Sequence, residues 1–208
     1  MVLQPQNESR VARTADFAVR VFSLAARLAV LLLYRRVKAA AAFSFQPIFL
    51  YQRAPAPTPY KTAEPDFTLL ARAFNRTRVL HPFYLTAWVF LPDHWHCIAG
   101  PRSPETISGV IKSVKQSSMS GINQSRGTEG ELWQPRFFDR ALRTVEEYNE
   151  KVEYIHQNPV RAGLVSRPQD WRWSSFNEYA GLSPAEQIER CGLIIDRIRI
   201  PSDLRTRI

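Results

Sequence analysis

The stretch Leu91-Pro92-Asp93-His94-Trp95-His96-Cys97-Ile98 decides the fold, and it holds two of the four histidines in the chain. It follows a run of aromatic and β-branched residues, 83–90, which predicts a strand. Proline and aspartate at 92–93 are typical of a turn, so we expect a hairpin whose second strand begins at His94. Side chains on a strand alternate between its two faces. His94 and His96 should therefore share one face, where two neutral imidazoles can hold a divalent cation, and Trp95 should pack on the other.

Length and composition predict a globular, basic protein. The chain has 208 residues, of which 45% are hydrophobic and 23% charged, which is enough for one domain with a real core. Its net charge of +9 favours a polyanionic partner, with nucleic acid as the first candidate. Cys97 and Cys191 form no C-x-x-C pair, so we expect neither a disulfide framework nor a thiolate zinc site. The predicted compartment is the cytoplasm.

The two ends of the chain differ from its middle. Residues 1–42 are expected to form an N-terminal extension, a loosely packed helix. Its uninterrupted apolar run, Leu28 to Tyr34, is far shorter than a membrane span, so no membrane association is expected. A signal peptide is a less favoured alternative, because no convincing cleavage site follows the alanines at 39–42. We expect a catalytic domain over 43–181 and a C-terminal tail over 182–208 without an assigned role.

The middle of the chain mixes strand and helix patterns. A first strand is predicted over 43–51, where Pro47 would confine it to a sheet edge or to a break. A helix begins with acidic residues at 64–66 and ends at His81-Pro82. Further predicted elements are a second amphipathic helix over 104–122, a polar loop over 123–130 and a strand over 132–139. Lys112 and Lys115 lie on the polar side of the second helix.

The last predicted helix carries a distinctive pair. The pattern Thr144-Val145-Glu146-Glu147 is a capping box, and Pro159 is expected to end the helix at about Asn158. Its apolar stripe comprises Val145, Tyr148, Val152 and Ile155. Tyr154 and Asn158 lie outside that stripe, one turn apart, on the side of Glu147 and Lys151. A phenol attacks poorly at its usual pKa near 10, but a divalent ion on the scissile phosphate can offset this. His156 lies nearer the stripe and is interpreted as a packing or supporting residue.

Four motifs in this order resemble the REP-associated tyrosine transposases, which are single-tyrosine HUH (histidine-hydrophobic-histidine) transposases. They are Pro92–His96, Trp133–Asp139, Tyr154–Val165 and Trp173–Phe176, and the resemblance covers roughly residues 43–181. It implies an α+β fold, an antiparallel β-sheet packed with α-helices, of the HUH-endonuclease (ferredoxin/RRM-like) type. Trp95 departs from the smaller aliphatic residue usual in the family, but it keeps the middle position apolar.

The resemblance also implies a reaction. His94 and His96 would hold Mg²⁺ or Mn²⁺, with Asn158 as the third protein ligand. Tyr154 would attack single-stranded DNA beside a hairpin formed by a palindromic repeat, which yields a 5′-phosphotyrosine link and a free 3′-hydroxyl. This link stores the bond energy for rejoining, so no ATP is needed. The protein would act as a monomer or a homodimer.

Basic residues offer a surface for the DNA phosphates. The candidates are Arg136, Arg140, Arg143, Arg161, Lys112 and Lys115. Interleaved aromatic residues offer faces on which unpaired bases can stack. We expect fewer than half of them to contact DNA, and Trp171 and Trp173 fit equally well as a closure of the core.

Two other functions are alternatives to the transposase. The first is a domesticated or decayed protein that binds nucleic-acid hairpins without cutting them. The second is a nucleotide hydrolase of the histidine-triad type. The hydrolase would need a histidine at position 98, where the chain has Ile98, and it is rejected.

Overall fold

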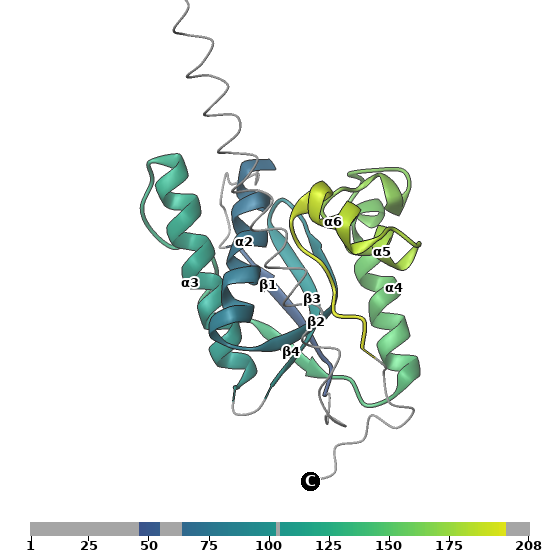
Figure 1. Cartoon of the computed structure of the whole chain (residues 1–208). Helices are drawn as coiled ribbons and strands as arrows, with labels where there is room; N and C mark the ends of the chain where they lie inside the picture. The colour runs from purple at the N-terminus through teal and green to yellow at the C-terminus, as the bar shows by residue number, and fades with distance from the viewer. Residues whose placement is uncertain (1–45, 55–63, 103–104, 199–208) are drawn as a thin grey trace, which may run out of the picture. The chain divides into compact units, whose positions relative to one another are not determined.

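The computed structural model describes residues 46–54, 64–102 and 105–198, so the predicted N-terminal extension lies outside the described residues. Their centre is a four-stranded antiparallel sheet with the strand order β2-β3-β1-β4 (Figure 1). Its strands are β1 (Ile48–Arg53), β2 (Phe83–Phe90), β3 (His94–Pro101) and β4 (Phe138–Ala141). With the helices packed on it, this sheet confirms the predicted α+β class.

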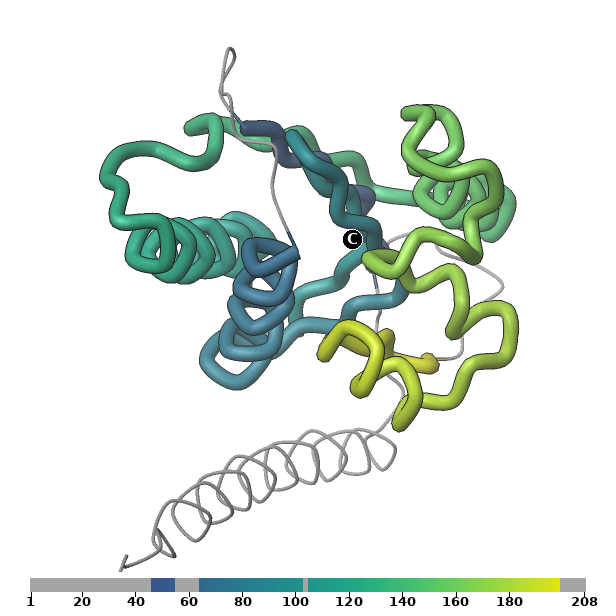
Figure 2. The backbone as a smooth tube through the Cα atoms, turned by 90° about the horizontal axis from the view of Figure 1, so that it is seen from above, coloured from purple at the N-terminus to yellow at the C-terminus, as the bar shows by residue number. Residues whose placement is uncertain are grey.

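Helices lie on both faces of this sheet. They are α2 (Glu64–Leu80), α3 (Ile107–Arg126), α4 (Val145–Arg161), α5 (Phe176–Tyr179) and α6 (Pro184–Cys191), with a 3₁₀ turn η1 (Pro168–Asp170). Helices α2 and α3 cover one face, and α4 lies over the other (Figures 1 and 2). In the part of the chain that the structure describes, no helix has both the length and the apolarity to cross a membrane.

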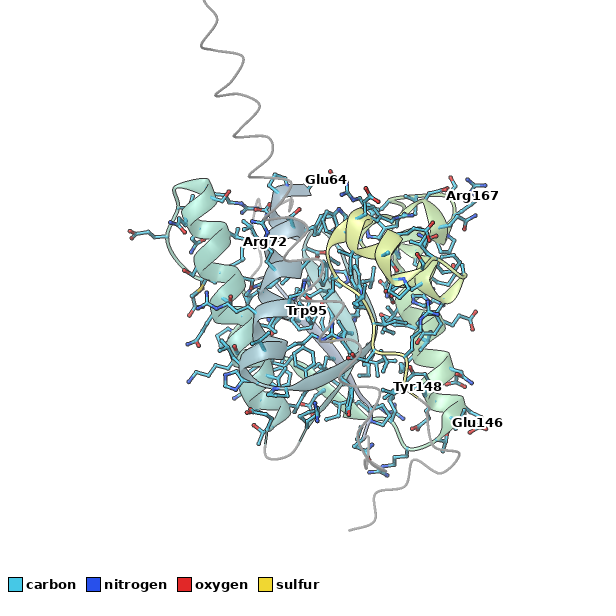
Figure 3. All side chains as sticks on the ribbon, viewed as in Figure 1. Glu64, Arg72, Trp95, Glu146, Tyr148 and Arg167 are labelled. Atoms are coloured by element: carbon cyan, nitrogen blue, oxygen red, sulfur yellow. The ribbon has the colours of Figure 1, made fainter. Side chains whose placement is uncertain are left out.

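The predicted hairpin and its alternation are confirmed. Strands β2 and β3 pair antiparallel, and the N–H of Leu91 donates to the carbonyl of His94 at 2.8 Å across the turn. Trp95 is fully buried on the side of α2 and α3, where its ring meets Phe74 at 5.3 Å between centroids. Figure 3 labels Trp95 on this side and Tyr148 on α4, opposite. The two histidines beside Trp95 therefore face the α4 side.

Of the two expectations about Pro47, a sheet edge or a break, strand β1 shows the break. The strand begins at Ile48, directly after the proline, and it is an inner strand between β3 and β4 rather than an edge. Pro47 lacks only a backbone N–H, and its carbonyl still accepts from the N–H of Leu142 at 2.9 Å. The proline therefore sets where the strand starts without confining it to the rim of the sheet.

Two further boundaries differ from the predictions. Helix α3 continues past 122 to Arg126 and ends at Gly127, whose φ of 63° is the left-handed conformation of a helix C-cap. The predicted strand over 132–139 is regular only from Phe138 onward. Trp133 instead turns its indole toward α3 and donates to Ser118 Oγ at 2.9 Å. That side-chain bond ties the segment before β4 to α3, while the N–H of Gln134 donates to the carbonyl of Arg53 at the end of β1 at 3.0 Å.

Helix α4 starts as predicted but does not end where expected. The Thr144 hydroxyl accepts from the N–H of Glu147 at 3.1 Å, which is the expected N-cap bond. Pro159 lies inside the helix, which runs on to Arg161. The proline removes one hydrogen bond in the last turn, yet the carbonyl of Asn158 still receives the N–H of Ala162 at 2.9 Å.

The segment after α4 closes the outer edge of β2. Ser175 exchanges hydrogen bonds with Trp88, and the N–H of Phe90 donates to the carbonyl of Trp173. Asp196 then pairs with the backbone of Leu85. Trp173 is buried in the core with Leu193 and Ile195, which shows that it closes the core as one of the two sequence interpretations proposed.

Candidate active site

The candidate site lies on the α4 face of the sheet, where β3 and β1 meet the helix. The rings of His94 and His96 are 4.9 Å apart between centroids. The phenol ring of Tyr154, from α4, lies 5.3 Å from the ring of His96. Strand β3 and helix α4 therefore bring together the imidazole pair and the predicted nucleophile, which are distant in sequence.

His96 occupies an apolar and unusual environment. Its side chain is 3% exposed and lies nearly parallel to the rings of Phe49 and Tyr51, its neighbours on β1. Burial is the main reason that its pKa falls to about 3, and the nearby His94 and Lys151 lower it further. Neither ring nitrogen has a hydrogen-bond partner among the described residues. Such buried polar atoms are costly and uncommon in folded proteins, and a neutral imidazole is the form that ligates a metal.

His94 is half-buried and held in one orientation. Its Nδ1–H donates to the Asp93 carboxylate at 2.6 Å, and its ring meets Tyr51 edge-on at 5.4 Å. A carboxylate on one nitrogen of an imidazole selects the tautomer that leaves the other nitrogen free to ligate. Arg53 lies 3.7 Å from the same carboxylate and helps to hold it. The turn that contains Asp93 therefore fixes the orientation of the His94 ring.

Tyr154 is half-buried, and two cations lie close to its ring. Lys151 Nζ is 5.3 Å from the centre of the phenol ring, and the Arg161 guanidinium carbon is also 5.3 Å away. Within the described residues, neither cation forms an ion pair with a carboxylate. Phe49 supports the phenol ring edge-on at 5.9 Å. Two uncompensated positive charges beside a phenol suit a reaction in which a phosphate comes to that oxygen.

Asn158 lies one turn beyond Tyr154 and is 8% exposed. The sequence placed it with the polar residues of α4, so its burial is a correction. Helix α4 presents a wider face to the sheet than its apolar stripe suggests. The amide nitrogen donates to the carbonyl of Tyr154 at 3.2 Å, which leaves the amide oxygen, the atom that would ligate a metal.

The predicted DNA-contacting residues divide between two regions. Arg161 adjoins Tyr154, and Arg140 lies on the exposed strand β4, where its guanidinium meets Glu147 at 3.0 Å. Arg136 and Arg143 are exposed close to β4 in sequence. Lys112 and Lys115 are elsewhere, on α3, which covers the opposite face of the sheet from the histidine pair (Figure 2).

His156 belongs to a different cluster. It is buried, its Nε2 shares a hydrogen bond with Ser175 Oγ at 2.9 Å, and its ring contacts Tyr179. Burial lowers its pKa to about 4. The interpretation of His156 as a packing residue is confirmed.

Sequence reasoning missed three contributors to the site. Phe49 and Tyr51 alternate on β1 and frame His96, but the proline before that strand obscured its position in the sheet. Lys151 lies three residues before Tyr154 on one side of α4, and this spacing was a usable signal. The pattern indicated only that Lys151 shares a side of the helix with Tyr154.

The side chains of the candidate site can hold a divalent metal ion only if an amide oxygen completes the set of ligands. No group of three or more histidine, cysteine, aspartate or glutamate side chains gathers for a metal within residues 46–54, 64–102 and 105–198. The unpartnered nitrogens of His96 and the orientated ring of His94 do fit a metal. A third protein donor would have to be a neutral oxygen, and Asn158 is the candidate on the adjoining helix.

Comparison with known proteins identifies the relatives of this chain. The family model described as "Transposase IS200 like" matches residues 69–158. The REP-associated tyrosine transposase of Escherichia coli K12 is 33% identical over 113 residues, which span 54% of this chain and 66% of that protein. The match therefore covers slightly less than two thirds of that relative. A solved structure, of a REP-associated tyrosine transposase bound to a REP hairpin, aligns with a TM-score of 0.56 at 26% identity. It covers 81% of this chain and 95% of that one.

Proposed function

The chain belongs to the REP-associated tyrosine transposase family, and on that premise we propose that it cuts and rejoins single-stranded DNA at hairpin-forming repeats. The strand transfer would proceed through a 5′-phosphotyrosine intermediate with the help of a divalent metal. The protein would act on DNA in the cytoplasm. Membership of the family supports a transposase-type enzyme, and the geometry of the site supports the assignment of its residues.

One observation carries the proposal. The phenol ring of Tyr154 lies 5.3 Å from the ring of His96, whose two nitrogens are buried without hydrogen-bond partners among the described residues. A structural histidine would satisfy at least one of these nitrogens, because an unmade buried hydrogen bond costs about 1–3 kcal/mol. A nucleophile next to such a histidine is the arrangement that metal-assisted cleavage needs.

We assign His94, His96 and Asn158 as the residues that would hold Mg²⁺ or Mn²⁺. When bound there, the ion would polarise the scissile phosphate and offset its negative charge. Asp93 keeps His94 in the ligating tautomer. The aromatic rings of Phe49 and Tyr51 exclude water from His96.

Tyr154 is the proposed nucleophile. Its oxygen forms the new bond to phosphorus as its proton leaves, while the bond from phosphorus to the 3′-oxygen breaks and that oxygen is protonated. Lys151 and Arg161 lie on the ring of Tyr154 and would contact the phosphate oxygens, where charge develops in the transition state. Rejoining reverses these steps, with a 3′-hydroxyl as the attacking group.

The DNA path proposed for this face follows the exposed strand β4 to α4. Arg136, Arg140, Arg143 and Arg161 would contact phosphates along it. His96 and Tyr154 belong to the same chain and are already close. One copy of the protein thus carries the proposed nucleophile and the proposed ligands, which is compatible with a monomer and with a homodimer.

The test is formation of a covalent adduct. The full chain is incubated with Mn²⁺ and a labelled DNA hairpin that has single-stranded flanks, and the products are separated by denaturing electrophoresis. We expect a protein–DNA band that Tyr154→Phe removes. Tyr148→Phe is the matched control, because Tyr148 is on the same helix but its hydroxyl is bonded to that of Tyr179 at 3.1 Å. This variant should keep the band.

Tight hairpin binding with no adduct at any flank would contradict the cleavage proposal. That outcome would favour the domesticated or decayed hairpin-binding protein. An adduct that persists in Tyr154→Phe would contradict the assignment of the nucleophile. Chelation of the divalent ion should abolish the adduct, and its persistence in a chelator would contradict the metal assignment.

A further inference from the structure

The two histidines of the candidate site are held in different ways. A histidine that ligates a metal usually donates its other ring N–H to an acceptor, which fixes the plane of the ring. His94 has such an acceptor in Asp93, at 2.6 Å. Neither nitrogen of His96 has a hydrogen-bond partner among the described residues. The lone pair of an imidazole nitrogen lies in the ring plane, so His96 needs some other support to aim it.

Two aromatic rings of strand β1 supply that support. The imidazole of His96 is stacked on the ring of Phe49, with 5.5 Å between centroids and 20° between planes. It is also stacked on the ring of Tyr51, at 4.9 Å and 25°. Both distances fall within the range of about 4.5–7 Å that favours aromatic pairs. Two nearly parallel rings therefore fix the plane of the imidazole.

The register of the sheet explains these contacts. Tyr51 is paired directly with His96 on β3, and Phe49 is the diagonal neighbour of His96, two residues away on β1. Direct and diagonal neighbours of an antiparallel pair are both within reach of aromatic side chains. Strand β1 pairs with β3 on one side and with β4 on the other. Its backbone is thus held on both sides, which makes it a firm base for a site.

The same two rings reach the other groups of the site. Tyr51 meets the ring of His94 edge-on at 5.4 Å, so it contacts both imidazoles. Phe49 meets the phenol ring of Tyr154 edge-on at 5.9 Å, so it links His96 to the helix that carries the proposed nucleophile. The rings of β1 therefore connect the two halves of the site.

We propose that Phe49 and Tyr51 are positioning residues, whose stacked rings orient His96 for metal binding in place of the usual hydrogen bond. The inference rests on the proposed function, because it takes His96 as a metal ligand and Tyr154 as the nucleophile. Phe49 has a second task, which is to hold Tyr154 in place beside the ligands. The face of each ring acts in this role, and the hydroxyl of Tyr51 does not.

The first experiment follows the ring of His96 without metal or DNA. The full chain is labelled with ¹³C-histidine, the His96 signal is assigned by its absence in His96→Gln, and ¹³C relaxation reports the motion of the ring. We expect a rigid ring in the wild type and in Tyr51→Phe, and a mobile ring in Tyr51→Leu. An equally rigid ring in Tyr51→Leu would overturn the proposal.

The second experiment measures metal affinity. Free Mn²⁺ is followed by electron paramagnetic resonance as the full chain is titrated. Tyr51→Leu should weaken Mn²⁺ binding about 10- to 100-fold, the usual effect of residues that support metal ligands. Tyr51→Phe should bind Mn²⁺ like the wild type, because it keeps the ring. Equal binding by Tyr51→Leu and the wild type would overturn the proposal. A loss in Tyr51→Phe as large as in Tyr51→Leu would also overturn it, since the hydroxyl would then be responsible.

The third experiment separates the two tasks by the rate of adduct formation. At saturating Mn²⁺, Tyr51→Leu should recover most of the wild-type rate. Phe49→Leu should stay about 10- to 100-fold slower, because misplacement of a nucleophile is not corrected by more metal. Wild-type rates for Phe49→Leu at saturating Mn²⁺ would overturn its second task.

Phe83→Leu is the matched control for Phe49→Leu. It removes the same atoms from a side chain that is 4% exposed, against 6% for Phe49. Phe83 packs in the core cluster on the α2 and α3 side of the sheet, where a separate hollow bordered by Lys112 opens beside α3. Measured where it is fully folded, this variant should keep wild-type Mn²⁺ binding and adduct formation. A loss equal to that of Phe49→Leu would overturn the specific role of Phe49.

Failure of the proposed function is distinguishable from failure of this inference. Absence of an adduct in the wild type counts against cleavage alone, because ring motion and Mn²⁺ binding still test the stacking. An adduct in the wild type together with a rigid His96 ring in Tyr51→Leu counts against the stacking alone.

Discussion

His96 and His156 are both buried imidazoles on the α4 side of the sheet, and burial lowers the pKa of each, to about 3 and about 4. They differ in their partners. His156 shares a hydrogen bond with Ser175, whereas the ring nitrogens of His96 are unpartnered among the described residues. Burial and a shifted pKa are therefore common to a packing histidine and a candidate ligand. The unmade hydrogen bonds are what separate the two.

The neighbours of the two histidines support the same distinction. His96 lies against two residues that could act on DNA, His94 and Tyr154. His156 lies against Phe176 and Tyr179, in the segment that closes the edge of β2. An unpartnered buried polar group calls for an explanation, and the proposed role as a metal ligand supplies one for His96. Mutation of His96 should consequently reduce mainly cleavage, and mutation of His156 should reduce mainly stability.

The largest expected effect is on cleavage in His96→Ala. Loss of a proposed metal ligand should reduce cleavage by about a thousandfold, or roughly 4 kcal/mol in the activation barrier. The free energy of unfolding should fall less than in His156→Ala, because removal of unpaired buried nitrogens offsets part of the cost of the cavity that the ring leaves. Cleavage assays and urea denaturation measure the two effects. A large loss of stability with cleavage intact would reverse the assignments of His96 and His156.

A buried glutamate sharpens the comparison, because Glu178 resembles His156 in being buried with a hydrogen-bond partner. Its carboxylate accepts from the N–H of Ile195 at 3.2 Å. Burial raises its pKa to about 8, although that hydrogen bond and the charges of Arg197 and Arg78 oppose the shift and Asp196 adds to it. The folded state thus retains a proton that the unfolded state loses above its ordinary pKa near 4.5.

Glu178 should therefore make the folded protein less stable as the pH rises. The stabilisation is fully present below pH 4.5 and is lost as the pH rises toward 8, at up to about 1.4 kcal/mol per pH unit. Relative to Glu178→Gln, the wild type should therefore lose about 2–4 kcal/mol between pH 5 and pH 8. Urea denaturation at several pH values measures this difference. Parallel curves for the two proteins would show that Glu178 is ionised in the folded state.

His156→Ala should mainly affect stability. It removes the hydrogen bond to Ser175 and leaves a cavity against Tyr179, which together should cost about 1–3 kcal/mol of unfolding free energy. Cleavage per folded molecule should remain near that of the wild type, measured where the variant is fully folded. A hundredfold loss of cleavage under those conditions would place His156 in the reaction.

Asp93→Asn should have the smallest effect. The amide can still accept from His94 but no longer carries the charge that favours the ligating tautomer. Residues that support metal ligands typically contribute 10- to 100-fold. Asp93 is half exposed, so water can partly replace it, and we expect about a tenfold loss of cleavage. Excess Mn²⁺ should restore part of the activity, and a loss that no metal concentration reverses would contradict this role.

Local patterns predicted much of the site. The hairpin, the shared face of His94 and His96 and the N-cap at Thr144 depend on residues close together in sequence. Strand alternation and N-cap bonds act over two or three residues, so they can be predicted without the rest of the chain. The resemblance to the family supplied the nucleophile and its chemistry, and the family and the fold class are confirmed.

Other features depend on elements that are distant in sequence. The extension of α4 beyond Pro159, the inner position of β1 and the burial of Asn158 follow from how the helix and strands pack. Packing can outweigh the loss of the one backbone hydrogen bond that a proline removes. A local sequence pattern does not reveal how strong that packing is.

The sequence by itself determined that the two histidines share one face of a strand and that the phenol lies outside the apolar stripe of its helix. Only the tertiary structure decided that His96 would be buried without a hydrogen-bond partner among the described residues, that Lys151 and Arg161 would lie close to the ring of Tyr154, and that Lys112 would border a separate hollow. The physical reason is that side-chain direction follows from local backbone geometry. The burial of a side chain, the electrostatic field around it and the shape of a cavity instead depend on elements that are distant in sequence and pack next to it.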